Sequence, residues 1–259
     1  QSLNNNDLKF LGRIHEFFDI KNTLNQVLNV FENTSVDLIY GLPNQSLSNW
    51  EKELNSFLTN FKLQHISAYQ LTIEKGTKFF NLLNNHKIQP INEEKEELFY
   101  KLTKNIIENH HFRQYEISNY SKNNFKSIHN QLYWKSENWI GIGPGAISRL
   151  WNKNNKRYEI ENYKKPSTWL KNILLNQHKL KKIEVLDDVV SDEEILMMGL
   201  RLNEGIEIKK LTKGSLTKKI IFKKLLDKQI IKIKNDKIMI ENKHLIKLNS
   251  ILYEIMNNH

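Results

Sequence analysis

Short β-type runs alternate with amphipathic helices in the first half of this chain. Runs rich in β-branched and aromatic residues occur at 37–42 and 65–73. Between them, Ser48 followed by Glu51 is the pattern of a capping box at the start of a helix. The apolar residues of this helix return every three or four positions: Trp50, Leu54, Phe57, Leu58 and Phe61. These signals predict one strand–helix–strand unit.

The pattern then continues along the chain. Asn92 is the predicted N-cap of a second helix, and further strands are expected at 115–118 and 139–142. Alternating strands and helices are typical of a parallel sheet, open or closed, with helices outside it. The chemistry of such folds gathers at the carboxyl ends of the strands, where we expect the turns at 41–44 and 143–145 to lie.

Asp37 is the first candidate site residue. The alternation of strand side chains places it on the inner face of the predicted sheet. A carboxylate buried there costs several kcal/mol, on the order of the penalty for an unpaired charge, unless it has a partner. That partner is either Arg13, in a purely structural pair, or the hydroxyls or cation of a ligand.

Aromatic residues precede a glycine-dense turn in the segment 129–148. The aromatic residues and the glycines are His129, Tyr133, Trp134 and Trp139, then Gly141, Gly143 and Gly145. Aromatic side chains offer flat surfaces with one polar handle, and glycines allow close backbone approach. The segment is therefore either a strand that ends in a Gly-Pro-Gly turn, with an ordinary structural histidine, or a site for a flat ligand.

The combination His129-Asn130-x-x-Tyr133-Trp134 with the glycine turn resembles the HemW family. These proteins are radical-SAM relatives of oxygen-independent coproporphyrinogen III oxidase (HemN). Further blocks similar to that family follow its order at 1–13, 36–45, 67–77, 115–119 and 199–205. The resemblance therefore extends from Gln1 to about Gly205.

This resemblance implies an α/β fold in three parts. Residues 1–152 would be the C-terminal part of an incomplete (β/α) radical-SAM barrel, 153–185 a connecting segment, and 186–259 a small winged-helix-like α+β domain. The implied function is that of a haem-binding chaperone that delivers haem to haem-accepting apoproteins. The alternative is the sister activity, oxidative decarboxylation of coproporphyrinogen III by a 5′-deoxyadenosyl radical. The His-Asn-x-x-Tyr-Trp motif favours the chaperone, and whether the parent is an enzyme stays open.

The resemblance also implies binding residues for S-adenosylmethionine (SAM). Positions that match Gln1, Arg13 and Asp37 contact SAM in HemN-like proteins, and the position that matches Ile147 lies against the adenosine. Thr72 matches a further contact. The family usually has histidine where this chain has Ile147, so any polar role of that histidine is lost here.

For haem, the resemblance points to the aromatic motif. It implies that His129 is an axial ligand or close contact of the haem iron, with Tyr133 and Trp134 packed on the macrocycle. A neutral imidazole nitrogen is a good iron ligand.

The chain contains no cysteine. Disulfides, cysteine nucleophiles and iron–sulfur ligands are therefore excluded within these residues. In the family a Cys-x3-Cys-x2-Cys loop, upstream of the segment that matches Gln1, holds the [4Fe–4S] cluster. Because the chain starts at Gln and joins the family pattern in its middle, we expect an N-terminally truncated fragment, inactive alone, which neither assembles the cluster nor cleaves SAM.

The last 74 or so residues, 186–259, are predicted to form helix, helix, hairpin and helix. Ser191 with Glu194 is a second capping-box pattern, a helix is expected at 216–226, and Asn235-Asp236 is a hairpin signal. Four lysines on the second helix could meet phosphates: Lys218, Lys219, Lys223 and Lys224. A winged-helix nucleic-acid-binding module is thus a rival function, disfavoured because no Arg, Ser or aromatic residue is interleaved to read base edges.

The net charge of +10 comes from lysine, and no block of five or more like charges occurs. No apolar run reaches membrane-spanning length, and no signal-peptide pattern leads the chain. We therefore expect a soluble, cytoplasmic protein.

Overall fold

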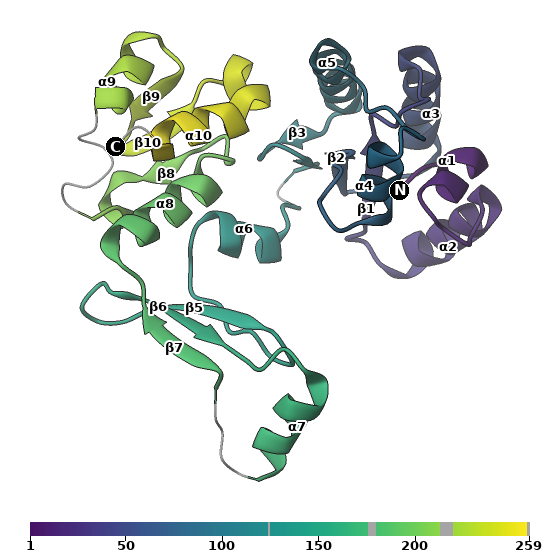
Figure 1. Ribbon diagram of the computed structural model, residues 1–259. Coiled ribbons are helices and arrows are strands. Elements are labelled where there is room, and N and C mark those ends of the chain that lie inside the picture. Colours follow the sequence, from purple (N-terminus) through teal and green to yellow (C-terminus); the bar gives the residue numbers. More distant parts are fainter. Residues whose placement is uncertain (124, 176–179, 213–219, 258–259) are drawn as a thin grey trace. The chain divides into compact units, whose positions relative to one another are not determined.

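The computed structural model describes residues 1–123, 125–175, 180–212 and 220–257 (Figure 1). The chain divides into two compact units, Gln1–Lys126 and Ser127–His259. This division precedes the boundary expected after residue 152. The reason is that Ile147–Trp151 (β5) pairs antiparallel with Arg157–Glu161 (β6), so residues 153–156 form the turn of a hairpin and not a connection between domains.

The first unit is a four-stranded sheet with helices. Its elements are α1 (Asn5–Phe10), α2 (Phe17–Val30), β1 (Ser35–Tyr40), α3 (Leu47–Asn60), β2 (His65–Gln70), α4 (Lys78–Asn84), α5 (Glu93–Asn109), β3 (Arg113–Gln114) and β4 (Asn119–Ser121). The strand order is β1-β2-β4-β3. The predicted strand–helix–strand unit is confirmed, because β1 and β2 are parallel and α3 connects them.

The helix starts follow side-chain caps. Asn92 caps α5 as predicted, and its side chain accepts a hydrogen bond from the backbone N of Lys95 at 3.0 Å. The predicted cap of α3 was wrong by two residues. Ser46 is the cap, and its hydroxyl accepts from the backbone N of Asn49 at 3.1 Å.

The expectation of an all-parallel sheet fails at its far edge. β4 is antiparallel to both β2 and β3. The predicted strand at 115–118 is instead the connection between β3 and β4. The carboxylate of Glu116 accepts hydrogen bonds from the backbone N of Ser118, at 3.0 Å, and from the side chain of Asn119. These local bonds hold the chain in a turn and compete with an extended strand.

The hydrophobic core lies on one face of this sheet. β1 and β2 contribute Leu38 and Ile66, which are buried against α3 and α5. Trp50 of α3 is fully buried, and its indole Nε1 donates to Thr103 Oγ1 of α5 at 2.8 Å. Because strand side chains alternate, the opposite face of the sheet is left to other residues.

The second unit contains two antiparallel sheets. Its elements are α6 (Ile128–Trp134), β5, β6, α7 (Pro166–Leu174), β7 (Lys182–Val185), α8 (Asp188–Gly199), β8 (Ile206–Glu207), η1 (Ile208–Lys210), α9 (Ile220–Asp227), β9 (Ile231–Lys234), β10 (Lys237–Ile240), η2 (Asn242–Lys247) and α10 (Leu248–Asn257). One sheet has the order β5-β6-β7 and the other the order β8-β10-β9.

The predicted strand at 139–142 is wrong. Trp139 forms only an isolated bridge with Arg149. Gly141 approaches the backbone of Ile147 so closely that a Cβ on it would lie 2.5 Å from the Ile147 carbonyl oxygen. The turn at 143–145 precedes β5 and does not follow a parallel strand. This glycine-dense segment is thus required by the local backbone path.

The C-terminal elements follow the predicted order. α8 begins at Asp188, and its cap is Asp187, four residues before the predicted cap Ser191. The helix expected at 216–226 is described from Ile220, and residues 216–219 lie outside the described part. The hairpin is confirmed: Lys234 pairs with Lys237, and Asn235 and Asp236 have φ of 50° and 56°. In the described part of the chain, no helix combines the length and apolar character needed to cross a membrane.

Candidate functional site

Polar side chains occupy the face of the first unit's sheet that lies opposite the hydrophobic core. In register, Asp37 of β1 is next to Ser67 of β2, and Ser67 is next to Asn119 of β4. Cross-strand partners point to the same face, so these three form one row. We call the following set the polar face: Ser35, Asp37, His65, Ser67, Tyr69, Tyr115, Glu116, Asn119 and Ser121.

A histidine–tyrosine pair lies within the polar face. His65 is only 3% exposed, and its two ring nitrogens lie 2.7 Å from Ser35 Oγ and 2.7 Å from Tyr115 Oη. Burial lowers the pKa of His65 below its usual value, and the carboxylate of Asp37 partly opposes this. The imidazole is therefore neutral near pH 7 and serves as a hydrogen-bonding link between the two hydroxyls.

A second group surrounds the Tyr69 hydroxyl. Burial raises the pKa of Tyr69, and hydrogen bonds from Ser67 and Asn119 lower it, whereas the charges of Asp37 and Glu116 raise it. Ser67, Asn119 and Glu116 are buried, but Tyr69 is 40% exposed. The phenol ring of Tyr69 is therefore partly exposed to solvent, whereas its polar neighbours are buried.

Two of the predicted SAM residues, Gln1 and Asp37, lie at β1. The carbonyl of Gln1 accepts from the backbone N of Ile39 at 2.8 Å. Thr72 follows the end of β2 and is exposed. Ile147 lies in the second unit, on β5.

The expectation of a buried Asp37 is wrong. Both Asp37 and Arg13 are exposed. The reason is that the inner face of the sheet is open at β1, so the carboxylate is hydrated and requires no protein partner. The penalty of several kcal/mol for a buried, unpaired charge does not apply to it.

The predicted haem residues separate into two faces of α6. His129 is exposed, and its ring meets that of Tyr133 edge-on, with 4.9 Å between centroids. Tyr133 in turn lies 4.9 Å from the Trp139 ring. Trp134 is turned away: the guanidinium of Arg201 lies 5.3 Å from its ring. Residues four apart on a helix share a face and residues one apart do not, so Trp134 does not join His129.

Trp134 instead lines a cavity of about 160 Å³ in the second unit, with Leu202, Glu204 and Gly205 among its neighbours. Residues of the family-like block 199–205 and Trp134 of the aromatic motif therefore line the same cavity. In the ranges that the structure describes, no three His, Asp or Glu side chains are grouped so as to hold a metal ion.

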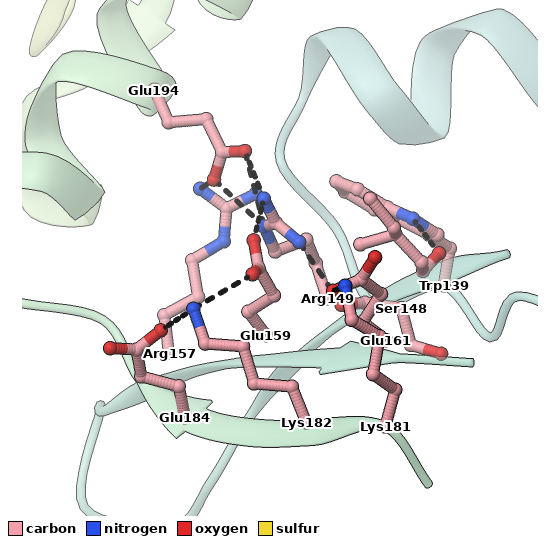
Figure 2. A network of polar contacts seen from close by, with 11 residues as sticks. Trp139, Ser148, Arg149, Arg157, Glu159, Glu161, Lys181, Lys182, Glu184 and Glu194 are labelled. Atoms are coloured by element: carbon pink, nitrogen blue, oxygen red, sulfur yellow. Dashed lines mark hydrogen bonds and ion pairs between the residues drawn. The ribbon is translucent and has the colours of Figure 1, made fainter. Parts of the chain in front are cut away.

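Two arginines and a glutamate connect the β5–β6 hairpin to α8 (Figure 2). Glu194 of α8 accepts a hydrogen bond from Arg149 Nε at 3.1 Å and forms an ion pair with Arg157 Nη1 at 3.0 Å. Arg157 is 1% exposed, and its guanidinium lies 5.6 Å from the Trp139 ring and 5.5 Å from the Trp151 ring. Trp139 therefore contacts both this arginine and Tyr133.

Sequence reasoning did not select most residues of the polar face or of the arginine network. His65, Ser67 and Tyr69 lie in or beside a block that resembles the family, and so do Tyr115 and Asn119. The missing information was the strand register, which brings these two blocks side by side. For Arg157 the sequence contains no such signal.

Comparison with known proteins identifies relatives. No protein-family model matches this chain. It is 35% identical over 210 residues, which are 80% of this chain and 47% of the relative, to the Danio rerio protein named radical S-adenosyl methionine domain-containing protein 1, mitochondrial. It is 30% identical over 260 residues to the Lactococcus lactis protein named heme chaperone HemW, with 100% of this chain and 65% of the relative covered.

The fold matches a solved structure. Coproporphyrinogen III oxidase (HemN) from Escherichia coli, described as a radical SAM enzyme, superposes with a TM-score of 0.72 over 99% of this chain and 62% of that chain, at 13% identity. The fold is therefore the radical-SAM fold of HemN, represented by part of the barrel and a C-terminal region. The chain spans about half the length of the radical S-adenosyl methionine domain-containing relatives that it matches.

Proposed function

We propose that this chain, which is similar to proteins named heme chaperone HemW and radical S-adenosyl methionine domain-containing protein 1, binds haem on α6 and S-adenosylmethionine on the polar face. The observation that carries the haem proposal is the exposed His129 with the Tyr133 ring held against it. An exposed imidazole next to a fixed aromatic ring offers an iron ligand and an apolar surface for a macrocycle. Delivery of haem to apoproteins is part of this proposal.

The SAM proposal concerns Gln1, Arg13, Asp37 and Thr72. Exposed Asp37 can accept hydrogen bonds from ligand hydroxyl or ammonium groups, and exposed Arg13 can pair with a carboxylate. In radical-SAM chemistry a bound SAM would supply a 5′-deoxyadenosyl radical and methionine after one electron from a [4Fe–4S] cluster cleaves its sulfonium C–S bond. A contribution of Ile147 from the second unit stays a prediction. The chain has no cysteine, so its residues do not fit a [4Fe–4S] cluster, and thiolates would have to come from outside these 259 residues.

Two alternatives remain. Coproporphyrinogen oxidation is the function in the name of the HemN structure, and the His129-Asn130-x-x-Tyr133-Trp134 motif favours haem binding over it. The nucleic-acid alternative rests on lysines of which Lys223 and Lys224 are exposed on α9 and the other two lie outside the described residues. A cytoplasmic location also stays a prediction, since the Danio rerio relative is named as mitochondrial.

Replacing His129 by Ala tests the haem proposal. We expect haem affinity to fall at least about tenfold and the Soret band to shift, because one axial ligand is lost. The measurement is a haem titration of the chain followed by absorbance. Tyr133→Leu is expected to weaken binding less, and Trp134→Leu hardly at all, because Trp134 lies on another face of α6.

The control is His244→Ala, a partly buried histidine of the same unit. Haem adheres to exposed apolar surfaces in general, so this variant reports the nonspecific part of the signal. Wild-type affinity and an unchanged spectrum in His129→Ala would remove the haem proposal and leave His129 as a surface residue.

A further inference from the structure

Tyr69 and Asp37 are exposed members of the polar face, together with Ser35. Tyr69 follows Ser67 by two residues on β2 and therefore points to the same face as the Asp37–Ser67–Asn119 row. Its side chain is 40% exposed, whereas Ser67 and Asn119 are 3% and 1% exposed. A ligand that reaches this face from solvent therefore meets the phenol ring and the carboxylate first.

Buried members of the polar face surround the Tyr69 hydroxyl. Ser67 and Asn119 both lower the pKa of Tyr69 through their polar side chains, and Ser67 lies two residues before it on the same face of β2. Asn119 is itself fixed, since its amide nitrogen donates to Glu116, whose carboxylate also accepts from the backbone N of Ser118 at 3.0 Å. The polar groups beside the phenol are therefore fixed by the fold before a ligand binds.

One buried acceptor on the polar face has no hydrogen-bond donor among the described residues. This acceptor is Asn119 Oδ1. A buried acceptor without a protein donor is unfavourable unless water or a ligand supplies the donor. Two carboxylates, Asp37 and Glu116, act on the same place and make the local potential negative, as their effect on the Tyr69 pKa shows.

We propose that Tyr69 and Asp37 bind an onium group, and that Asn119 Oδ1 accepts a hydrogen bond where this group is an ammonium. An aromatic face attracts a cation through its quadrupole, and a carboxylate adds charge. SAM carries two such groups, a sulfonium and an ammonium. The inference rests on the proposed SAM binding and assigns Tyr69 and Asn119 as further residues of that site.

The test compares three probes on the chain by calorimetry. SAM and S-adenosylhomocysteine differ by the sulfonium charge, and S-adenosylhomocysteine and methylthioadenosine differ by the amino-acid group with its ammonium. In Tyr69→Leu we expect at least one of these two affinity ratios to shrink about fivefold, because the cation–π contact is lost. Tyr69→Phe keeps the ring but not its hydroxyl and should lose less.

Tyr253→Leu is the matched control, because Tyr253 is 70% exposed on α10 of the other unit. Asp37→Ala separates the two proposals. If it weakens S-adenosylhomocysteine binding while a folded Tyr69→Leu keeps both ratios, SAM binding stands and the onium site is wrong. If the unaltered chain binds none of the three probes at millimolar concentration, both proposals are wrong.

Discussion

Glu194→Ala is expected to lower the free energy of unfolding of the second unit by about 3 kcal/mol. Glu194 neutralises Arg157, which is 1% exposed, and also pairs with Arg149. Breaking a buried pair by removing one partner leaves an uncompensated charge, which costs about 3–5 kcal/mol. We place the value at the lower end because the Glu194 side chain is 19% exposed.

Two features make Arg157 depend on this one carboxylate. Burial lowers the pKa of its guanidinium, Glu194 raises it, and the nearby Arg149 lowers it. Its nitrogens make no well-oriented hydrogen bond to the described residues. Without Glu194, Arg157 would lose its paired carboxylate and keep the indole rings of Trp139 and Trp151, while Arg149 would keep Glu159.

The measurement is urea unfolding followed by tryptophan fluorescence. Four of the five tryptophans lie in the second unit, the exception being Trp50, so this signal reports mainly on that unit. Glu207→Ala is the control, since Glu207 pairs with Lys209 at the surface and such pairs contribute little. Equal stability of the Glu194 and Glu207 variants would contradict the proposed role of the network.

The network also bears on the proposed haem face. Trp139 contacts Arg157 on one side and Tyr133 on the other, and Tyr133 contacts His129. A shift of Trp139 in Glu194→Ala would therefore move the ring on which His129 rests. A haem titration of Glu194→Ala, at a temperature where the variant is folded, would measure the effect of this shift on haem binding at His129.

The parts of the fold that the sequence predicted are those determined locally. The apolar spacing of Trp50, Leu54 and Phe57 requires one buried helix face, and this face is present. Asn92 and the Asn235-Asp236 turn act through their own backbone neighbours, and both predictions are confirmed. Capping and turn geometry depend on four or five consecutive residues, which a sequence displays directly.

The failures have two causes: side chains that hydrogen-bond to the nearby backbone and displace a predicted strand, and contacts with other segments of the chain. Residues 115–118 have strand-forming types, but the Glu116 carboxylate folds them into a turn. Residues 139–142 look like a strand until Gly141 meets the backbone of Ile147. The exposure of Asp37 follows from the open edge of the sheet, and the meeting of Asp37, Ser67 and Asn119 follows from strand register. Periodicity determines which face a residue occupies, and register determines its neighbours.

Gly205→Ala is expected to destabilise the second unit by about 2–4 kcal/mol. Gly205 has φ of +68°, which costs a residue with a Cβ about 1 kcal/mol. An added Cβ would also lie 2.2 Å from the Ile238 carbonyl oxygen and 2.7 Å from Met239 Cβ. Relieving that overlap requires movement of β10, to which β8 is paired at Ile206–Ile238, and overpacking of this kind costs about 1–3 kcal/mol more.

Gly145→Ala provides a control that isolates the steric part of this effect. Gly145 lies in the same unit and has nearly the same φ, +70°, but its added Cβ would meet Lys164 only at 3.6 Å, an ordinary contact. We therefore expect it to lose about 1 kcal/mol, the cost of the backbone conformation alone. Because Gly205 lines the same cavity as Trp134, quenching of tryptophan fluorescence by acrylamide should rise in Gly205→Ala and stay unchanged in Gly145→Ala. Equal unfolding free energies for the two variants would show that β10 moves away from the added Cβ at no cost. The close approach at Gly205 would then contribute nothing to the stability of this unit.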